Sequence, residues 1–455
     1  MPVGSHLRLF SALSLAASSL MVAAPARASI TKGPYLQGLG ATETQIRIEL
    51  SPPTPASVEI FSLANGAKTS ASVAHADSPN AEMHSLRVTG LTPATSYRFV
   101  VTAGKESAEG AFTTAAANDA KTPFSFLIYG DNRTDNDAHA AVVRQMAQIP
   151  SDFLINTGDL IEDGNEPALW QRFFDIEGEL LRKRCLFAAV GNHELHETSG
   201  ANFLRYFGDD DPGAAGLRKL YRTVRWENTR FFFLNGMDTF NTSDERRWLD
   251  GELSKSEAEP NLTWRIVVLH QGAWSSGPHG NNPRLWDAGG VDVLRAHKVD
   301  LIVSGHDHIY ERGDSNGMKY VVSGGGGAPL YAVGKKLPTT RKAESTLHFI
   351  ETKIEGDKFV MTVRRGDGSL LENCGFVKGA VWDCDSNPKV AAAASDASIM
   401  DPKSPQNNDN SSPAQTTTSR CGCELVGSNA DNFAAPYLVL LAVPLLRRRK
   451  HSYAD

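Results

Sequence analysis

The sequence has few cysteines and no strong excess of charge of either sign. Five cysteines occur among 455 residues, and 46 basic against 52 acidic residues leave a formal net charge of −6. A strongly basic surface is therefore not expected, and we predict no nucleic-acid partner. The chain is longer than one domain and can bury a large core.

The sequence also lacks a complete phosphate-binding loop. The glycine-rich run SGGGGAP, Ser323–Pro329, does not end in the Gly-Lys-Ser/Thr that such loops require. We predict a flexible turn beside the functional site instead.

The cysteines differ in the roles that their positions allow. Cys374 and Cys384 can close a short disulfide loop if the chain folds in an oxidising compartment. Cys185 is predicted to be a small buried hydrophobic residue. Cys421 and Cys423 are too close in sequence for an ordinary bridge within the chain.

The first 28 residues are typical of an export signal. They hold an apolar stretch rich in small residues, followed by an A-x-A cleavage site at Ala26, Arg27 and Ala28. A buried helix is the alternative. The mature chain is therefore predicted to begin near Ser29 and to lie outside the cytoplasm.

The C-terminal part changes composition twice. Residues 386–420 are rich in Ala, Ser, Asn, Pro and Thr, which predicts a disordered stalk. Residues 421–455 combine a cysteine pair, an arginine cluster and an apolar run shorter than the roughly 20 residues that a spanning helix needs. This combination resembles the sorting tags of the myxosortase type, which implies attachment to a bacterial cell surface. A plain membrane anchor is the alternative.

Two folded regions are expected between these ends. Residues 29–117 show short alternating runs separated by turn residues, which predicts an all-β sandwich with a spacer or substrate-guiding role. Its segment LTPATSYRFVV resembles the late strands of fibronectin type III domains, in which Tyr97 would lock a corner. In residues 118–385, apolar strands alternate with helical stretches, which indicates an α/β layered domain.

Polar residues able to bind metals follow five of the apolar strands of the α/β region. They are Asp131, Asp159, Asn192 with His193 and Glu194, His270, and His306 with His308. Ligands of α/β sheets bind at the carboxyl ends of the strands, so these side chains are expected to converge. Carboxylate, amide and imidazole groups suit divalent or trivalent ions. The set is too large for one ion and suits two ions about 3.5–4 Å apart, which can hold a hydroxide that attacks phosphorus.

The series GD, GD, GNHE, H and GHDH resembles the calcineurin-like metallophosphoesterase superfamily. GPYLQ and GHDHIYER make it similar to purple acid phosphatases over about residues 30–365. The resemblance implies two packed mixed sheets flanked by helices. It implies that Asp131, Asp159 and His308 hold one metal ion, and that Asp159 bridges to a second ion held by Asn192, His270 and His306.

The same resemblance assigns His193 to the substrate phosphate and His279 to protonation of the leaving oxygen. For His279, a solvent-facing loop histidine is the alternative.

Two positions depart from the family pattern. Arg133 stands where the superfamily commonly has a histidine, and a guanidinium cannot ligate a metal but can clamp a phosphate. Glu162 stands where purple acid phosphatases have a tyrosine, so no tyrosinate-to-iron charge transfer is expected. We predict that His139 or Glu162 completes the first metal site. A solvent-facing helix histidine and a plain loop carboxylate are the alternatives.

The sequence thus predicts an exported, surface-attached phosphoric ester hydrolase with two ions of Fe, Zn or Mn. A phosphomonoesterase of the acid phosphatase type is favoured. Phosphodiesterase or nucleotidase activity at the same site is one alternative. A non-catalytic surface-binding protein with a degenerate metal site is the other.

Overall fold

The computed structural model describes Met1 and residues 29–385, apart from residues 76–80, 119–121, 197–199, 209–219 and 238–242. The predicted export signal beyond Met1, the stalk and the sorting segment lie outside the described residues. None of the described helices is both long and apolar enough to cross a membrane.

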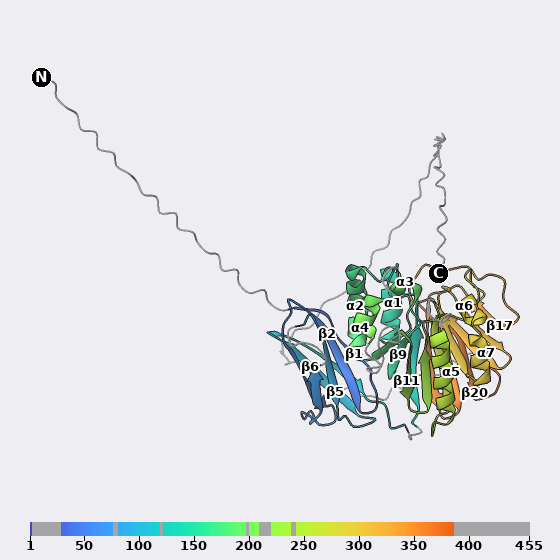
Figure 1. Ribbon diagram of the computed structural model, residues 1–455, viewed down its shortest axis with the longest axis horizontal. Coiled ribbons are helices and arrows are strands. Elements are labelled where there is room, and N and C mark those ends of the chain that lie inside the picture. Colours follow the sequence, from blue (N-terminus) through green and yellow to red (C-terminus); the bar gives the residue numbers. More distant parts are fainter. Residues whose placement is uncertain are drawn as a thin grey trace, which may run out of the picture. The chain divides into compact units, whose positions relative to one another are not determined.

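The N-terminal region consists of two antiparallel sheets (Figure 1). The first sheet has the order β1 (Ser29–Gln37), β2 (Glu43–Ser51), β5 (Met83–Thr89), β4 (Ser72–His75), and the second has the order β3 (Ala56–Ser62), β6 (Ser96–Ala103), β7 (Glu106–Thr113). Alternate residues of β6 are buried, as expected for a strand with one face on a core. The Tyr97 hydroxyl accepts a 2.9 Å hydrogen bond from the Thr92 N–H. This bond is the one expected of a tyrosine corner.

The α/β region contains two mixed seven-stranded sheets. The first has the order β10 (Cys185–Ala188), β9 (Phe153–Asn156), β8 (Phe124–Tyr129), β18 (His348–Glu355), β19 (Lys358–Arg365), β20 (Leu370–Val377), β21 (Asp383–Cys384). The second has the order β11 (Arg222–Trp226), β12 (Thr229–Phe233), β13 (Trp264–Gln271), β14 (Leu301–Gly305), β16 (Met318–Ser323), β15 (Tyr310–Ser315), β17 (Thr340–Glu344). Strands β8, β9 and β10 are mutually parallel, as are β12, β13 and β14.

The two sheets pack face to face through apolar side chains. Phe126 and Phe153 of the first sheet meet Phe231 of the second at ring-centroid distances of 5.4 and 5.7 Å, edge to face. The described helices are α1 (Asn136–Met146), α2 (Pro167–Leu181), α3 (Asn192–Leu195), α4 (Ala201–Phe207), α5 (Ser243–Glu257), α6 (Pro283–Asp287) and α7 (Gly290–Ala296). The predicted fold class, a β-sandwich followed by two packed mixed sheets with helices, is confirmed.

The N-terminal sheets pack directly against the α/β region. The Tyr35 hydroxyl of β1 donates a 2.9 Å hydrogen bond to the Tyr206 carbonyl of α4. The Gln37 amide donates to the Leu186 carbonyl of β10 at 3.3 Å. Side chains of both regions also share one apolar core. The two regions therefore form one compact unit and are not joined merely by a linker.

The described cysteines behave as predicted. Cys374 of β20 and Cys384 of β21 form a disulfide bond, and Cys185 of β10 is buried and takes part in no disulfide. Cys421 and Cys423 lie outside the described residues.

Candidate metal centre

The strand-end residues lie at the carboxyl ends of parallel strands, five strands in all. Asp131 follows β8, Asp159 follows β9, Asn192 and His193 follow β10, His270 lies near the end of β13, and His306 and His308 follow β14. The site is therefore built where the two sheets meet at one edge.

Three of these residues have left-handed backbone conformations, which are uncommon for residues other than glycine. The φ angles are 55° at Asp131, 55° at Asp159 and 69° at His306. The backbone bonds around them hold this geometry: the Asp131 N–H donates to the Gly158 carbonyl at 3.0 Å. Such conformations persist where the surrounding structure enforces them, and they concentrate at functional sites.

Asp159, His270 and His306 form the centre of the site. The His270 Nε2 lies 3.2 Å from Asp159 Oδ1 and 3.1 Å from His306 Nδ1. Because the His270 Nδ1 donates to the Thr157 carbonyl at 2.9 Å, its Nε2 is the atom left to face the other two side chains. One ligand atom from each of the three residues lies within 4.8 Å of the others. This spacing suits a shared cation.

The side-chain oxygen of Asn192 is a second, independent indication of a bound cation. This Oδ1 atom is buried and has no hydrogen-bond partner among the described residues, although a buried amide oxygen normally has one. The Asn192 residue begins α3 directly after the β10 strand end. An amide oxygen, a carboxylate and two imidazoles together form a reasonable donor set for a divalent or trivalent ion. The residues present therefore fit the metal that the sequence predicts.

Burial and the closeness of carboxylates and imidazoles shift the pKa values of the site. Burial acts against the charged form of His270, but the Asp159 and Asp131 carboxylates outweigh it and raise the pKa of His270 to about 10. Burial raises the pKa of Asp131 to about 8, even though His270 opposes this shift. Burial also acts on Asp159, but His270 and His193 hold its pKa below the usual range. Burial and the adjacent His270 lower the pKa of His306 to about 2, which leaves its imidazole in the neutral form that binds metals.

Asp131 and His308 adjoin this centre, with Asp131 Oδ1 3.9 Å from His270 Nε2. The Asp131 carboxylate accepts the His306 N–H at 3.0 Å, and the His308 Nε2 lies 3.6 Å from Asp131 Oδ1. The His308 Nδ1 contacts the Pro329 carbonyl at 2.6 Å, so its Nε2 faces the site. Its ring stacks on Tyr331 with centroids 4.0 Å apart.

The Arg133 side chain contacts both Asp159 and His308. Its Nε donates to Asp159 Oδ2 at 3.3 Å, and its Nη2 lies 3.5 Å from His308 Nε2. Its Nη1 donates to Glu162 Oε2 at 2.7 Å. The Glu162 carboxylate also accepts a hydrogen bond from Thr134. The Glu162 carboxylate is therefore paired with Arg133 and Thr134 in this structure, and its role as a ligand of the first metal stays a prediction.

His139, the other residue predicted to complete the first metal site, is paired within the protein. The His139 Nε2 lies 2.9 Å from Glu177 Oε1 and 3.3 Å from Asn132 Nδ2, and Tyr129 donates to the same carboxylate at 2.7 Å. The solvent-facing alternative is wrong, because His139 is only 2% exposed. This histidine belongs to a buried polar network beneath the site.

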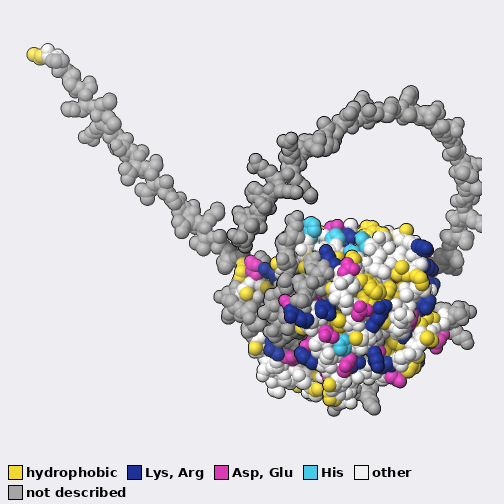
Figure 2. Space-filling view, turned by 45° about the vertical axis from the view of Figure 1, so that its right-hand side comes forward, with side chains coloured by type: hydrophobic (Ala, Val, Ile, Leu, Met, Phe, Trp, Pro, Cys, Tyr) yellow, Lys and Arg dark blue, Asp and Glu magenta, His cyan; other side chains and the backbone are white. Residues whose placement is uncertain are grey.

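His193 and His279 lie at the open side of the site. The His193 N–H donates to Asp159 Oδ1 at 3.1 Å, and its Nε2 lies 3.8 Å from Asp159 Oδ2. The His279 ring lies with its centroid 4.1 Å from that of His306. The side chains of His193 and His279 are 21% and 41% exposed. Histidine side chains reach the surface close to one another on the face shown in Figure 2.

Residues 124–310 match the protein-family model described as calcineurin-like phosphoesterase. These residues form a calcineurin-like phosphoesterase domain. Uncharacterized protein Rv2577 of Mycobacterium tuberculosis is 27% identical over 267 residues, which cover 50% of this chain and 49% of the relative. Purple acid phosphatase 7 of Arabidopsis thaliana is 26% identical over 249 residues, which cover 46% of this chain and 71% of that protein. The chain thus spans about half the length of the first relative and more of the second.

A solved structure extends the similarity to the fold. The purple acid phosphatase PPD1 from yellow lupin (Lupinus luteus) seeds superposes with a TM-score of 0.65 at 16% identity. The superposition covers 76% of this chain and 74% of that protein. At this identity the similarity shows a shared fold and does not by itself show a shared activity.

Sequence reasoning assigned no role to two acidic residues of the phosphoesterase domain. Glu194 is buried and accepts backbone hydrogen bonds from Asp159 at 3.0 Å, Leu160 at 2.8 Å and Gly191 at 2.8 Å. It thereby fixes the loop that carries Asp159. Asp307 accepts the His279 N–H at 3.0 Å and contacts the His279 Nδ1 at 2.9 Å. Glu194 lies inside the GNHE motif, and Asp307 lies between His306 and His308. These two positions were the signals in the sequence that could have indicated a role.

The glycine-rich run, Ser323–Pro329, lies beside the site as predicted, but it is largely buried and hydrogen-bonded to the site's loops. The Gly326 N–H donates to the Gly130 carbonyl at 2.8 Å, and the Ala328 N–H donates to the Asp131 carbonyl at 2.7 Å. A Cβ at Gly324 would lie 2.2 Å from the Asp307 carbonyl oxygen. The glycines therefore allow close approach of the backbone to both metal-site loops.

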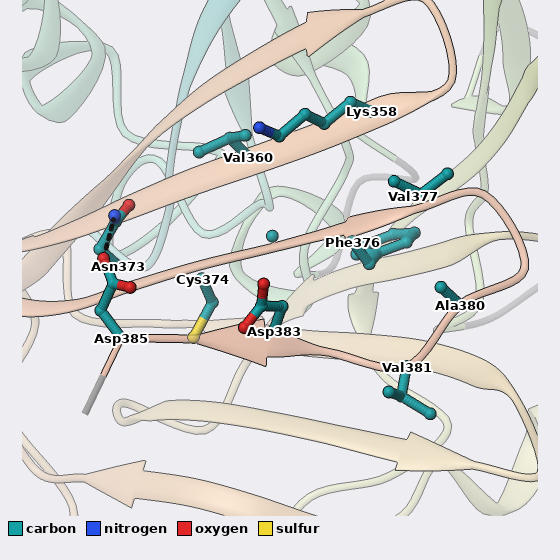
Figure 3. A pocket seen from close by; sticks show the side chains of 11 residues that line it. Lys358, Val360, Asn373, Cys374, Phe376, Val377, Ala380, Val381, Asp383 and Asp385 are labelled. Carbon is teal, nitrogen blue, oxygen red and sulfur yellow. Dashed lines mark hydrogen bonds between the residues drawn. The ribbon is translucent and has the colours of Figure 1, made fainter.

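A separate pocket of the α/β region lies at the disulfide. It has a volume of about 430 Å³ and is lined by residues of β19, β20 and β21, including Phe376, Val381 and Asp383 (Figure 3). None of the strand-end residues lines it. A grouping of Glu372, Cys374 and Cys384 lies nearby, but the two sulfurs are bonded to each other and offer no thiolate.

Proposed function

We propose that this chain is a metal-dependent phosphoric ester hydrolase that acts as a phosphomonoesterase. The observation that carries the proposal is the convergence of Asp159, His270 and His306 with the unpartnered Asn192 oxygen at one edge of the two sheets. The calcineurin-like phosphoesterase match over residues 124–310 supports the same reaction class.

The residues proposed to hold metal are Asp159, Asn192, His270 and His306, with Asp131 and His308 adjoining them. The family resemblance predicts two ions that share Asp159, of Fe, Zn or Mn. A cation bound there supplies Lewis-acid stabilisation of the phosphoryl charge and activates water as the nucleophile.

The protein groups that face solvent would position the substrate and move its proton. His193 lies next to Asp159, and its Nδ1 contacts the Glu162 carbonyl, which directs its Nε2 toward the site and a substrate phosphate. The His279 Nδ1 is held by Asp307, so its Nε2 is free to donate a proton to the leaving oxygen. This step lets the leaving group depart as an alcohol.

The direct test is hydrolysis of a panel of aryl phosphates, bis-aryl phosphates and nucleotides after reconstitution with Fe, Zn or Mn. Asp159→Asn is expected to abolish hydrolysis, because the shared carboxylate of the site is lost. The matched control is Asp292→Asn on α7, where the carboxylate is 82% exposed. Faster hydrolysis of bis-aryl phosphates than of aryl phosphates would favour the phosphodiesterase alternative. Absence of hydrolysis with bound metal would favour the surface-binding alternative.

We also propose that the protein is exported and attached to the cell surface, as the terminal segments predict. The disulfide between Cys374 and Cys384 supports folding in an oxidising compartment. Cell fractionation of the full chain and of a variant lacking residues 421–455 tests this. Release of the shortened variant into the medium is expected, and full-length protein found only in the cytoplasm would contradict the proposal.

A further inference from the structure

The number of ions depends on Arg133, because its guanidinium lies among the side chains assigned to the first ion. It is 3.3 Å from Asp159 Oδ2 and 3.5 Å from His308 Nε2. These two residues are among the three that the family resemblance assigns to that ion. The Arg133 side chain is only 13% exposed, so solvent screens this contact weakly.

A guanidinium keeps its positive charge in proteins and cannot donate a lone pair to a metal. A metal ion bound to Asp159 Oδ2 and His308 would therefore lie next to a fixed like charge. The repulsion between like charges at such separations is strong in a partly buried site. The Arg133 charge and an ion at this position thus compete for the same carboxylate oxygen.

No described side chain completes the first metal site against this repulsion. Glu162 is paired with Arg133 and Thr134, and His139 is paired with Glu177. The first ion would have only Asp131, Asp159 and His308 as protein ligands, and the Arg133 guanidinium would lie beside them.

The two oxygens of Asp159 have different partners. Oδ1 faces the His270 Nε2 at 3.2 Å, and that nitrogen lies 3.1 Å from His306 Nδ1. Oδ1 also accepts the N–H of His193, the residue after Asn192, at 3.1 Å. Oδ2 accepts the hydrogen bond from Arg133. The carboxylate that bridges two ions in the family pattern therefore has an arginine on one oxygen and a metal-binding set on the other.

We propose that the Arg133 guanidinium replaces the first metal ion, so that the chain holds one catalytic ion, at Asp159, Asn192, His270 and His306. Arg133 supplies the second positive charge and binds a phosphoryl oxygen of the substrate, a role that rests on the proposed function. The contacts of Arg133 with Asp159 and His308 place its guanidinium within the strand-end cluster, where a bound phosphate would lie. Arginine suits this role because its planar N–H groups match phosphate oxygens.

The test is the metal content of the purified chain after loading with Mn²⁺ and removal of excess ion, measured by mass spectrometry and electron paramagnetic resonance. We expect about one ion per chain and the spectrum of an isolated Mn²⁺. Arg133→His restores the common residue of the superfamily and should raise the content to about two ions, with the spectrum of a magnetically coupled pair. Arg133→Lys keeps the charge and should stay at about one ion.

Two further variants locate the ion in the wild-type background. His270→Ala should lower the content to near zero, whereas His308→Ala should leave it at about one ion. Two ions in the wild type, or loss of the ion in His308→Ala but not in His270→Ala, would overturn the inference. If the wild type holds two ions and hydrolyses aryl phosphates, the inference fails and the proposed function stands. If it holds one ion and hydrolyses no phosphate ester, the proposed function fails instead.

Discussion

The two oxygens of Asp159 divide the candidate site into halves that differ in charge. The Asn192 half comprises Asp159 Oδ1, Asn192, His270 and His306, and the Arg133 half comprises Asp159 Oδ2, Arg133, Asp131 and His308. The first offers lone pairs and a buried amide oxygen without a partner. The second already contains a fixed cation. One carboxylate can therefore serve two different electrostatic roles within a single fold.

The largest expected effect on the rate of hydrolysis comes from removing one histidine from each half and comparing the two losses. His270→Ala should lower aryl phosphate hydrolysis by at least about 10²–10³-fold, the scale of losing a main electrostatic stabiliser of the transition state. His308→Ala should cost about 10–100-fold, like the loss of an outer partner of a metal site. Steady-state kinetics on both variants checks this. Equal losses would show that the halves do not differ as described.

Replacement of Asp307 should have a smaller effect on hydrolysis, because Asp307 acts through His279 at the open side of the site. Asp307→Asn should weaken the orientation of His279 and slow hydrolysis of an alkyl phosphate by about 10-fold. An aryl phosphate with a good leaving group needs less proton donation and should be affected less. The ratio of the two rates is the measurement, with Asp292→Asn as the control. A uniform loss on both substrates would mean that Asp307 acts only on the structure.

Glu194 holds the loop that carries both Asp159 oxygens, so its replacement should affect both halves of the site. Glu194→Gln replaces an acceptor oxygen that serves backbone N–H groups and should lower the free energy of unfolding by about 1–3 kcal/mol. Hydrolysis should also fall, because the loop that positions both Asp159 oxygens loosens. Urea denaturation measures the first effect, with the 85% exposed Glu179→Gln on α2 as the control. Unchanged stability would contradict the role assigned to Glu194.

The smallest effect on activity is expected far from both halves. Replacing Cys374 and Cys384 by serine should lower the free energy of unfolding by about 2–4 kcal/mol, because the unfolded chain gains freedom. Hydrolysis per folded molecule should stay unchanged, since neither residue adjoins the strand-end cluster. Denaturation of oxidised protein against the double variant, followed by an activity assay, measures both. A large loss of activity in folded protein would link the two sites.

The sequence predicts the strands and the residues at their ends, because both depend on local patterns. Apolar runs followed by Asp131, Asp159, His270 and His306 are visible without knowledge of the fold, and parallel strands bring their carboxyl ends to one edge. The disulfide was predictable for the same reason, since its cysteines are close in sequence.

The pairing of side chains across loops was not predictable. Whether His139 faces a metal or Glu177 depends on a contact between two helices, α1 and α2. The Arg133 contacts reach His308, 175 positions later in the chain. No local pattern encodes the direction of these side chains, so the sequence alone did not predict these pairings.

The most direct test of the account is anomalous X-ray diffraction from crystals loaded with Mn²⁺ or Zn²⁺. The account predicts one strong anomalous peak, enclosed by Asp159 Oδ1, Asn192 Oδ1, His270 and His306, with the Arg133 guanidinium still on Asp159 Oδ2. Loaded crystals without a peak among these four side chains would contradict it.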